Sequence, residues 1–246
     1  QTGTQSRSSR KGIGEAVKYV QAGNLGKILL SRGLCYKRRA SIGKTEGEQK
    51  IPETVEYDLW CGPGPKGPLM RQKLKYDWHW TWAYGNGDLG NQGIHQMDIA
   101  RWFLGEMELS PSVWSVGGRL GYEDDGETAN TQIIYHGYEK APLIFEVRGL
   151  PDSKDGKNMD KLMQTSKGVK FQPLPDKDGK DGVNGAGVGV IVECEGGTVV
   201  VPNYSGAIVF DKDGKEVRKF EGTSDHFKNF INACRKTPAN YGEIFA

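Results

Sequence analysis

One segment of the chain combines residue types and spacing that suit acid–base chemistry. Residues 84–105, YGNGDLGNQGIHQMDIARWFLG, place a glycine-rich turn before the pattern of an amphipathic helix. Residues three and four apart on a helix share a face, and one such face would carry Asn91, His95, Asp98 and Trp102. A carboxylate beside an imidazole can set its tautomer and its pKa. His95 and Asp98 are therefore the candidate catalytic residues.

The same helix also allows a purely structural interpretation. Asp98 could cap the helix or pair with Arg101. His95 could be a half-buried histidine whose ring nitrogens are hydrogen-bonded within the protein. Ile94 and Leu104 fall on neighbouring stripes of the helix and are expected in the core. The spacing alone leaves both interpretations open.

Aromatic residues crowd the segment that precedes this helix, KYDWHWTWAYGNG. Strand-like alternation would place Trp78, Trp80 and Trp82 on one side and His79 on the other. Rings at this density either fill a core or form a platform for sugar rings and bases. The candidate substrate-binding residues around the histidine are Asn91, Asp88, Trp78, His79, Trp80, Trp82 and Arg71.

The sequence GNGDLG at 85–90 matches G-x-G-x-x-G, the fingerprint of dinucleotide-binding turns. The segment before it is polar and aromatic, whereas a central parallel strand is a buried aliphatic run. The strands expected after it alternate without intervening helices, so no doubly wound sheet is predicted. We predict no cofactor-binding residues here, and no metal site, because His79, His95 and Asp88 lack a diagnostic spacing.

Composition and charge narrow the classes of partner. The 246 residues include 33 basic and 31 acidic side chains, a balance that argues against nucleic acid and anionic membranes as partners. No apolar run reaches the ~18 residues of a membrane helix. The polar opening QTGTQSRSSR does not resemble a signal peptide. Because the cysteines lack a C-x-x-C spacing, structural zinc is not expected. The sequence does not indicate the cellular compartment.

Periodicity predicts the regular elements before the histidine helix. Residues 1–8 are predicted as an exposed or interrupted strand, and a helix should follow Ser9 and stop at Gly23. Alternation predicts a strand from Lys27 to about Arg39. Residues 40–68, which end in CGPGPKGP, are predicted as a rigid irregular loop.

Strand-like runs dominate the chain after the histidine helix. Two groups of three runs flank residues 151–186, a stretch rich in Asp, Lys and Gly that is predicted as a second long irregular loop. DKDG at 211–214 is a candidate hairpin turn. A last helix should begin at Ser224 and turn Phe227, Phe230 and Ile231 inward. These elements predict an α+β fold with an open, mostly antiparallel or mixed sheet and helices on one face, in a single domain over residues 1–246.

Three segments resemble the C-terminal domain of the Gfo/Idh/MocA oxidoreductase family, which includes glucose–fructose oxidoreductase and inositol dehydrogenase. GTQSRSSRKGIGEAVKYVQAGNLGKILLSRG resembles the helix and first long strand that open this domain, and DHFKNFINACRK resembles its late helix. The most specific match is GNGDLGNQGIHQMDIARWFLG with the family's G-G-G-x-L-x-D-x-G-I-H-x-x-D helix. By this resemblance His95 corresponds to the catalytic histidine and Asp98 to the carboxylate one turn later. Asn91 stands where the family usually has Asp; an amide can hold a hydroxyl but cannot act as an acid or base.

The resemblance implies a sugar or polyol substrate, with NAD(P) as cofactor in the full-length family arrangement. The family's N-terminal Rossmann domain and its E-K-P motif do not occur in this sequence. No cofactor is therefore expected to bind this chain alone, and the nucleotide-binding domain would be lost, cleaved or separate. A broad uncovered sheet face also predicts a homo-oligomer.

Three functions remain open at this point. The first is the substrate-binding domain of a sugar oxidoreductase, with His95 taking the hydroxyl proton. The second is a cofactor-independent glycoside hydrolase or lyase, whose two carboxylates would come from Asp58, Asp77, Asp88 and Asp98. The third is a non-catalytic carbohydrate-binding module that uses the tryptophans as a platform.

Overall fold

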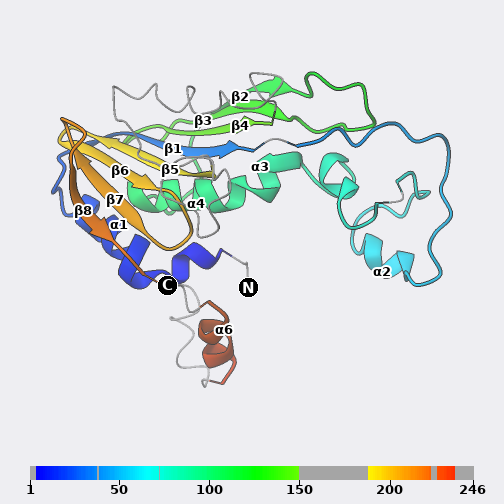
Figure 1. The fold of residues 1–246 in the computed structure, drawn as a ribbon, viewed down its shortest axis with the longest axis horizontal. Coiled ribbons are helices and arrows are strands. Elements are labelled where there is room, and N and C mark those ends of the chain that lie inside the picture. The colour runs from blue at the N-terminus through cyan, green and yellow to red at the C-terminus, as the bar shows by residue number, and fades with distance from the viewer. Residues whose placement is uncertain (1–3, 38, 72, 150–187, 223–225, 236–246) are drawn as a thin grey trace.

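The computed structural model describes residues 4–37, 39–71, 73–149, 188–222 and 226–235. The strands are β1 (Ile28–Tyr36), β2 (Val113–Gly118), β3 (Thr131–His136), β4 (Leu143–Arg148), β5 (Val188–Cys194), β6 (Gly197–Val201), β7 (Ala207–Asp211) and β8 (Glu216–Phe220). They form one eight-stranded sheet in the order β2-β3-β4-β1-β5-β6-β7-β8 (Figure 1). β1 and β4 are parallel and the other neighbours are antiparallel, which confirms the predicted open, mixed sheet.

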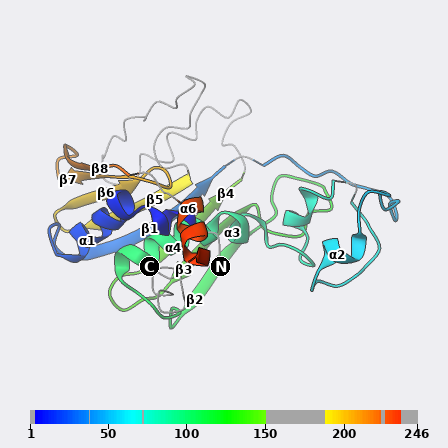
Figure 2. The ribbon, with the colours of Figure 1, turned by 90° about the horizontal axis from the view of Figure 1, so that it is seen from below.

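The helices are η1 (Gln5–Ser8), η2 (Arg10–Gly14), α1 (Glu15–Gln21), α2 (Tyr57–Cys61), η3 (Asp77–Trp80), α3 (Gly87–Asn91), α4 (Gly93–Leu104) and α6 (His226–Arg235). Of these, α1 and α4 pack on one face of the sheet, and α2 and η3 belong to the segment between β1 and α3. From below, α1 and α4 lie in front of the strands (Figure 2). Within the described ranges, no helix is long and apolar enough to cross a membrane.

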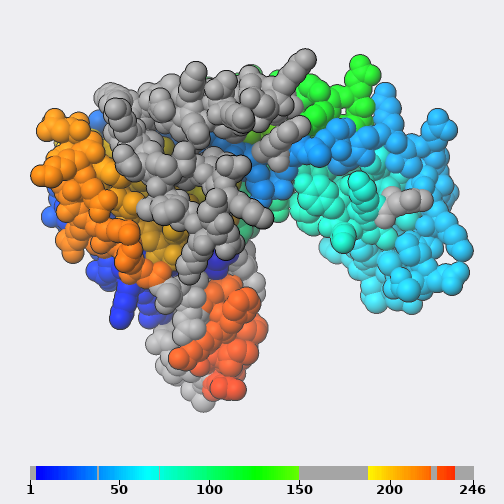
Figure 3. All heavy atoms as spheres, viewed as in Figure 1, coloured from blue at the N-terminus to red at the C-terminus, as the bar shows by residue number. Residues whose placement is uncertain are grey.

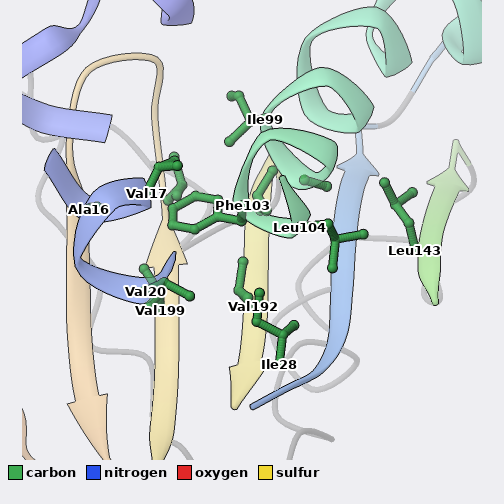
Figure 4. Packing of buried hydrophobic residues seen from close by; sticks show 14 of the residues in the cluster. Ala16, Val17, Val20, Ile28, Ile99, Phe103, Leu104, Leu143, Val192 and Val199 are labelled. Atoms are coloured by element: carbon green, nitrogen blue, oxygen red, sulfur yellow. The ribbon is translucent and has the colours of Figure 1, made fainter. Parts of the chain in front are cut away.

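The main core lies between the sheet and the helices α1 and α4. Val17 and Val20 of α1 meet Phe103 of α4 above Val192 and Val199 of the sheet (Figure 4). The apolar stripe of each helix and the alternation of each strand supply these side chains, as the two periodicities require. The core therefore fixes the long axis of α4 against the centre of the sheet.

α4 lies close to β1 because of a glycine. A Cβ added at Gly33 would stand 3.1 Å from the Cβ of Gln96 and 3.1 Å from a ring atom of Phe145. Ser31, two residues earlier on the same face of the strand, donates its hydroxyl to the carbonyl of Ala100 at 3.0 Å. Strand and helix are thus joined by close packing and by a buried hydrogen bond.

Residues 40–85 extend to one side of the sheet and form what we call the aromatic lobe (Figures 1 and 3). Residues 40–68, which the sequence predicts as a rigid irregular loop, contain the short helix α2. Within the lobe, Tyr57, Cys61 and Leu69 form a small buried cluster of their own. The second predicted irregular loop, 151–186, lies outside the described residues.

Several local predictions are wrong. Residues 5–8 form a 3-10 helix and not a strand, since the chain turns there to lay Arg7 against α4. On α6, the side chains of Phe227, Phe230 and Ile231 were predicted to be buried. They are 84%, 48% and 43% exposed, so the described residues do not bury them. The predicted cap of α6, Ser224, lies outside the described residues. The predicted hairpin at 211–214 is confirmed by the bond from the Asp211 amide to the Lys215 carbonyl, 2.9 Å.

Candidate functional site

The predicted histidine helix is two helices, α3 and α4, which meet at Gln92. Gln92 has φ −107° and ψ −37°, and its amide still bonds to the carbonyl of Asp88 at 3.0 Å. Its own carbonyl accepts the amide of His95 at 3.0 Å. His95 therefore lies in the first turn of α4, and Asn91 belongs to a different helix.

His95 is a half-buried imidazole. Its Nδ1 atom is buried and has no hydrogen-bond partner among the described residues. The ring of Tyr204, from the loop between β6 and β7, meets it edge-on with centroids 5.2 Å apart. Burial lowers the pKa of His95 below its usual value, and the negative charge of Asp98 opposes this effect. A lowered pKa favours the uncharged ring, which can accept a proton.

Asp98 is held by a residue that the sequence analysis did not connect with it. Arg7 donates from Nε and Nη2 to the two carboxylate oxygens of Asp98, each at 2.8 Å. The same guanidinium lies 4.5 Å from the centre of the Trp102 ring. No hydrogen bond joins Asp98 to His95 within the described part of the chain, and the partner of Asp98 is not Arg101. Asp98 acts on His95 through its charge.

Tyr204 and Gln92 surround His95, and neither was identified from the sequence. The side-chain amide of Gln92 donates to the Tyr204 hydroxyl at 2.6 Å. This bond ties the β6–β7 loop to the start of α4 and holds the Tyr204 ring against the imidazole. A lone tyrosine more than a hundred residues from the histidine gives no signal in the sequence.

Asp88 is fully buried and paired with Arg39. The guanidinium donates from Nε at 2.9 Å and from Nη2 at 2.7 Å, one bond to each carboxylate oxygen. These bonds raise the pKa of Arg39. Asn91, which is exposed, reaches the same carboxylate at 3.4 Å. Asp88 is therefore engaged within the protein, whereas the Asn91 side chain faces solvent.

The tryptophans do not form the predicted row, because residues 77–80 are a 3-10 helix and not an extended strand. Trp80 is 1% exposed and Trp82 is 63% exposed, so they lie on different sides of the chain. Trp78 stacks on His79 with ring centres 3.8 Å apart.

Arg71, in the aromatic lobe, is held by ion pairs and hydrogen bonds to other residues of the protein. It bonds to Asp77 at 2.9 Å and to Asp125 at 2.6 Å, and it donates to the carbonyls of Ile42 and Gly43. The lobe also contains two cavities, of about 450 and 410 Å³, that are lined by aromatic side chains. His95 lines neither of them.

The GNGDLG turn does not fit a dinucleotide. A Cβ at Gly87 would stand 2.8 Å from the hydroxyl of Thr128 and 3.0 Å from the carbonyl of Ala129, so protein atoms fill the space that a pyrophosphate would need. The chain before the turn is η3 and not a parallel strand. The structure thus offers no cofactor cradle at this turn. In the described residues, no group of three or more His, Cys, Asp or Glu side chains could hold a metal ion.

A family comparison accounts for the fold around this helix. The family model described as "Oxidoreductase family, C-terminal alpha/beta domain", of the Gfo/Idh/MocA type, matches residues 13–153. The chain belongs to this family. The match includes α1, β1, the aromatic lobe and α4, and it confirms the resemblance found in the sequence.

Several solved structures are similar to this chain at low sequence identity. A putative oxidoreductase from Erwinia carotovora atroseptica is 17% identical, with a TM-score of 0.50 over 96% of this chain and 56% of that one. The WlbA dehydrogenase of Bordetella pertussis, determined with NADH and UDP-GlcNAcA, is 16% identical, with a TM-score of 0.47 over 93% and 50%. Levoglucosan dehydrogenase, determined with NADH and levoglucosan, is 14% identical, with a TM-score of 0.49 over 89% and 46%. The chain spans about half the length of these structures. A comparison with curated proteins finds no match.

Proposed function

We propose that this oxidoreductase-family domain binds a sugar or polyol and supplies His95 as the base that removes a substrate hydroxyl proton. The observation that carries the proposal is the state of His95: a half-buried imidazole whose pKa is lowered by burial, with Asp98 one turn away. A base must be deprotonated at working pH and must have a lone pair available for the proton. The lowered pKa of His95 favours the first condition. Because Nδ1 is buried, Nε2 is the nitrogen that would take the proton.

Proton transfer to His95 would produce an imidazolium one turn from Asp98. The Asp98 carboxylate favours that charge, and Arg7 holds the carboxylate in place through two bonds of 2.8 Å. Asp98 is thus proposed as a positioning and charge-stabilising residue. The neighbouring bond between Gln92 and Tyr204 would keep the imidazole plane fixed.

Substrate hydroxyls would be oriented by Asn91 and by ring surfaces nearby. Asn91 is exposed, and its amide can both donate and accept. Asp88 would act indirectly, since it is closed off by Arg39 and touches Asn91 at 3.4 Å. NAD(P), which the family implies, would accept the hydride, and we assign no residue of this chain to it.

The glycoside hydrolase alternative is not favoured. Its four candidate carboxylates each pair with a cation: Asp58 with Lys66, Asp77 with Arg71, Asp88 with Arg39 and Asp98 with Arg7. Glycoside hydrolysis needs two carboxylates that face the substrate, and each of these four is engaged in an ion pair within the protein.

We also propose that residues 1–246 act as one unit that self-associates through the sheet face opposite α4. Trp114, Tyr135 and Ile144 are in register across β2, β3 and β4 on that face, and Trp114 is 56% exposed. A dimer or larger assembly in solution, reduced to a monomer by Trp114→Glu, is the expected result. A monomeric mass for the unaltered chain at micromolar concentration would contradict this proposal.

The base is tested by observing His95 while sugars bind. A panel of monosaccharides and polyols is titrated into ¹³C-histidine-labelled protein, and the His95 ring signals are followed from pH 5 to 8. We expect a sugar that shifts these signals at pH 8 and loses affinity as His95 protonates. His95→Gln should bind the same sugar without the pH dependence.

Turnover is then measured with NAD(P)⁺ on the protein that the whole reading frame encodes. His95→Gln should lower kcat by about 10²–10⁴-fold, the usual contribution of a general base. Cofactor-free release of sugar from a glycoside panel, or binding that leaves the His95 signals unchanged, would overturn the proposal.

A further inference from the structure

The two cavities of the aromatic lobe form one cleft with two compartments. Trp60, Trp78, Ala83 and Tyr84 line both cavities, whose volumes are about 450 and 410 Å³. Shared walls make the cavities neighbours, and each has a size typical of small-molecule sites. We call this feature the lobe cleft.

The aromatic walls of the lobe cleft pack against other rings, one of which, Tyr57, also lines the 410 Å³ compartment. Trp60 stacks on Tyr57 with ring centres 5.7 Å apart and planes 11° from parallel. Trp78 stacks on His79 at 3.8 Å and 19°. Tyr84 also packs edge-on against Trp60, with ring centres 4.9 Å apart. Because each indole packs on other rings, the aromatic surface that a ligand meets in the cleft would lose little freedom on binding.

Charged side chains of both signs line the 410 Å³ compartment: Arg71, Lys73, Asp125 and Glu127. Two cations balance two anions, so the compartment has no excess charge for a phosphate. Arg71 is held by Asp125 at 2.6 Å, and one oxygen of Glu127 accepts the Trp82 amide at 2.6 Å. Glu127 keeps further lone pairs, and Lys73 is an exposed donor. Donors and acceptors beside aromatic faces suit a neutral molecule with many hydroxyls and apolar ring faces.

Tyr84 lines both compartments of the lobe cleft. The phenol of Tyr84 donates to the Pro65 carbonyl at 2.7 Å, and its bonds and burial raise its pKa. Tyr84 therefore stays protonated and offers no base. No residue of α4 lines either compartment, so the cleft is independent of His95.

We propose that the lobe cleft binds an oligosaccharide of at least two pyranose rings, stacked on Trp60 and Trp78 and hydrogen-bonded by Lys73 and Glu127. One ring would occupy each compartment across the shared aromatic wall. The proposal does not rest on the function assigned to His95. It gives this domain a second carbohydrate contact in the irregular segment between β1 and α3.

Calorimetry and tryptophan fluorescence test the proposal with maltose, cellobiose, xylobiose and diacetylchitobiose, and with glucose and AMP for comparison. We expect at least one disaccharide to bind at micromolar to millimolar concentration and more tightly than glucose. Trp60→Ala should weaken it at least tenfold and Trp60→Phe by less, since a ring remains. Lys73→Met, which keeps the aliphatic stem at an exposed position, should weaken it several-fold in a protein with an unchanged melting temperature.

Trp82→Ala is the matched control. Trp82 is a neighbouring tryptophan, 63% exposed, that lines neither compartment, so its removal should leave the affinity within twofold. The inference is overturned if no disaccharide binds, if AMP binds more tightly than every disaccharide, or if Trp82→Ala and Trp60→Ala weaken binding equally. Disaccharide affinity that falls with His95→Gln and not with Lys73→Met would also overturn it, and would leave the proposal for His95 intact.

Discussion

The helix α4 and the aromatic lobe carry the two candidate sites, and different forces hold them. α4 is anchored by apolar burial: Ile99, Phe103 and Leu104 are at most 1% exposed. The lobe has a smaller apolar cluster and depends on ion pairs: Arg71 with Asp125 ties it to the rest of the chain, and Arg39 with Asp88 joins the two segments that flank it.

This difference has consequences for how each site responds to its surroundings. Apolar burial does not depend on protonation, so the backbone of α4 should keep its place over a wide pH range. Ion pairs lose their strength when carboxylates are protonated. The lobe should therefore loosen under acid before α4 does.

The largest expected effect is in the α4 core. Phe103→Ala should lower the free energy of unfolding by about 3–5 kcal/mol, because it removes a large ring and leaves a cavity between α1, α4 and the sheet. Urea denaturation measures the change. Leu109→Ala, at a position 86% exposed, should stay within about 0.5 kcal/mol of the unaltered chain. A loss below about 1.5 kcal/mol for Phe103→Ala would show that the core repacks.

The next effect concerns the ion pair at the base of the lobe. Arg39→Met leaves the buried Asp88 carboxylate without its cation, and we expect a loss of about 3 kcal/mol or more. The double variant Arg39→Met with Asp88→Leu should recover more than half of this loss, since no buried charge remains. Hydrogen exchange should place the weakened protection in α3 and the lobe. Equal loss of protection throughout α4 would contradict the separation of the two regions.

A smaller and local effect is expected at acid pH. Two bonds from Arg119, with others from Ser41 and the Ile42 amide, hold the pKa of Asp124 well below its usual range. A depressed carboxyl pKa adds stability above the unfolded value of ~3.9, and this stability is lost as pH falls towards the folded value. Amides near residues 41–45 should therefore lose protection below about pH 4.

Asp124→Asn provides the control for this acid effect. The amide cannot ionise, so the variant should show weaker protection at neutral pH and little further loss between pH 4 and 2. If α4 amides lose protection at the same pH as residues 41–45, the contrast between apolar and ionic anchoring fails.

The smallest effect is on His95. Asp98→Asn removes the charge that raises the pKa of His95, so this pKa should fall further below its usual value, as an NMR titration of the ring would measure. Because the folded pKa lies below the unfolded value of ~6.5, stability from this group is present above that pH and declines as pH falls. His95→Gln should abolish that decline. Asp213→Asn, in the exposed 211–214 turn, should leave the His95 titration unchanged, and a rise in the pKa with Asp98→Asn would refute the charge coupling.

Local pattern was sufficient for much of the fold. Alternation in TQIIYH and LIFEVR predicted β3 and β4, and helical spacing placed His95 and Leu104 on a helix against the sheet. Such periodicities reflect which side of an element must be buried, and they can be read directly from the order of apolar and polar residues. Ile94 was misassigned: it is 43% exposed, because it lies on the outer side of the first turn of α4, away from the face that buries Leu104.

The tertiary structure alone decided which polar groups meet. Arg7 pairs with Asp98 across 91 residues and Arg39 with Asp88 across 49. Tyr204 reaches His95 from another loop, and a 3-10 turn separates Trp80 from Trp82. The amino-acid sequence determined the sheet, its helices and the histidine, because periodic burial is a local property of the chain. The partners of that histidine, and the walls of the lobe cleft, depend on where the chain returns in space, because any cation can pair with any carboxylate that the fold brings near.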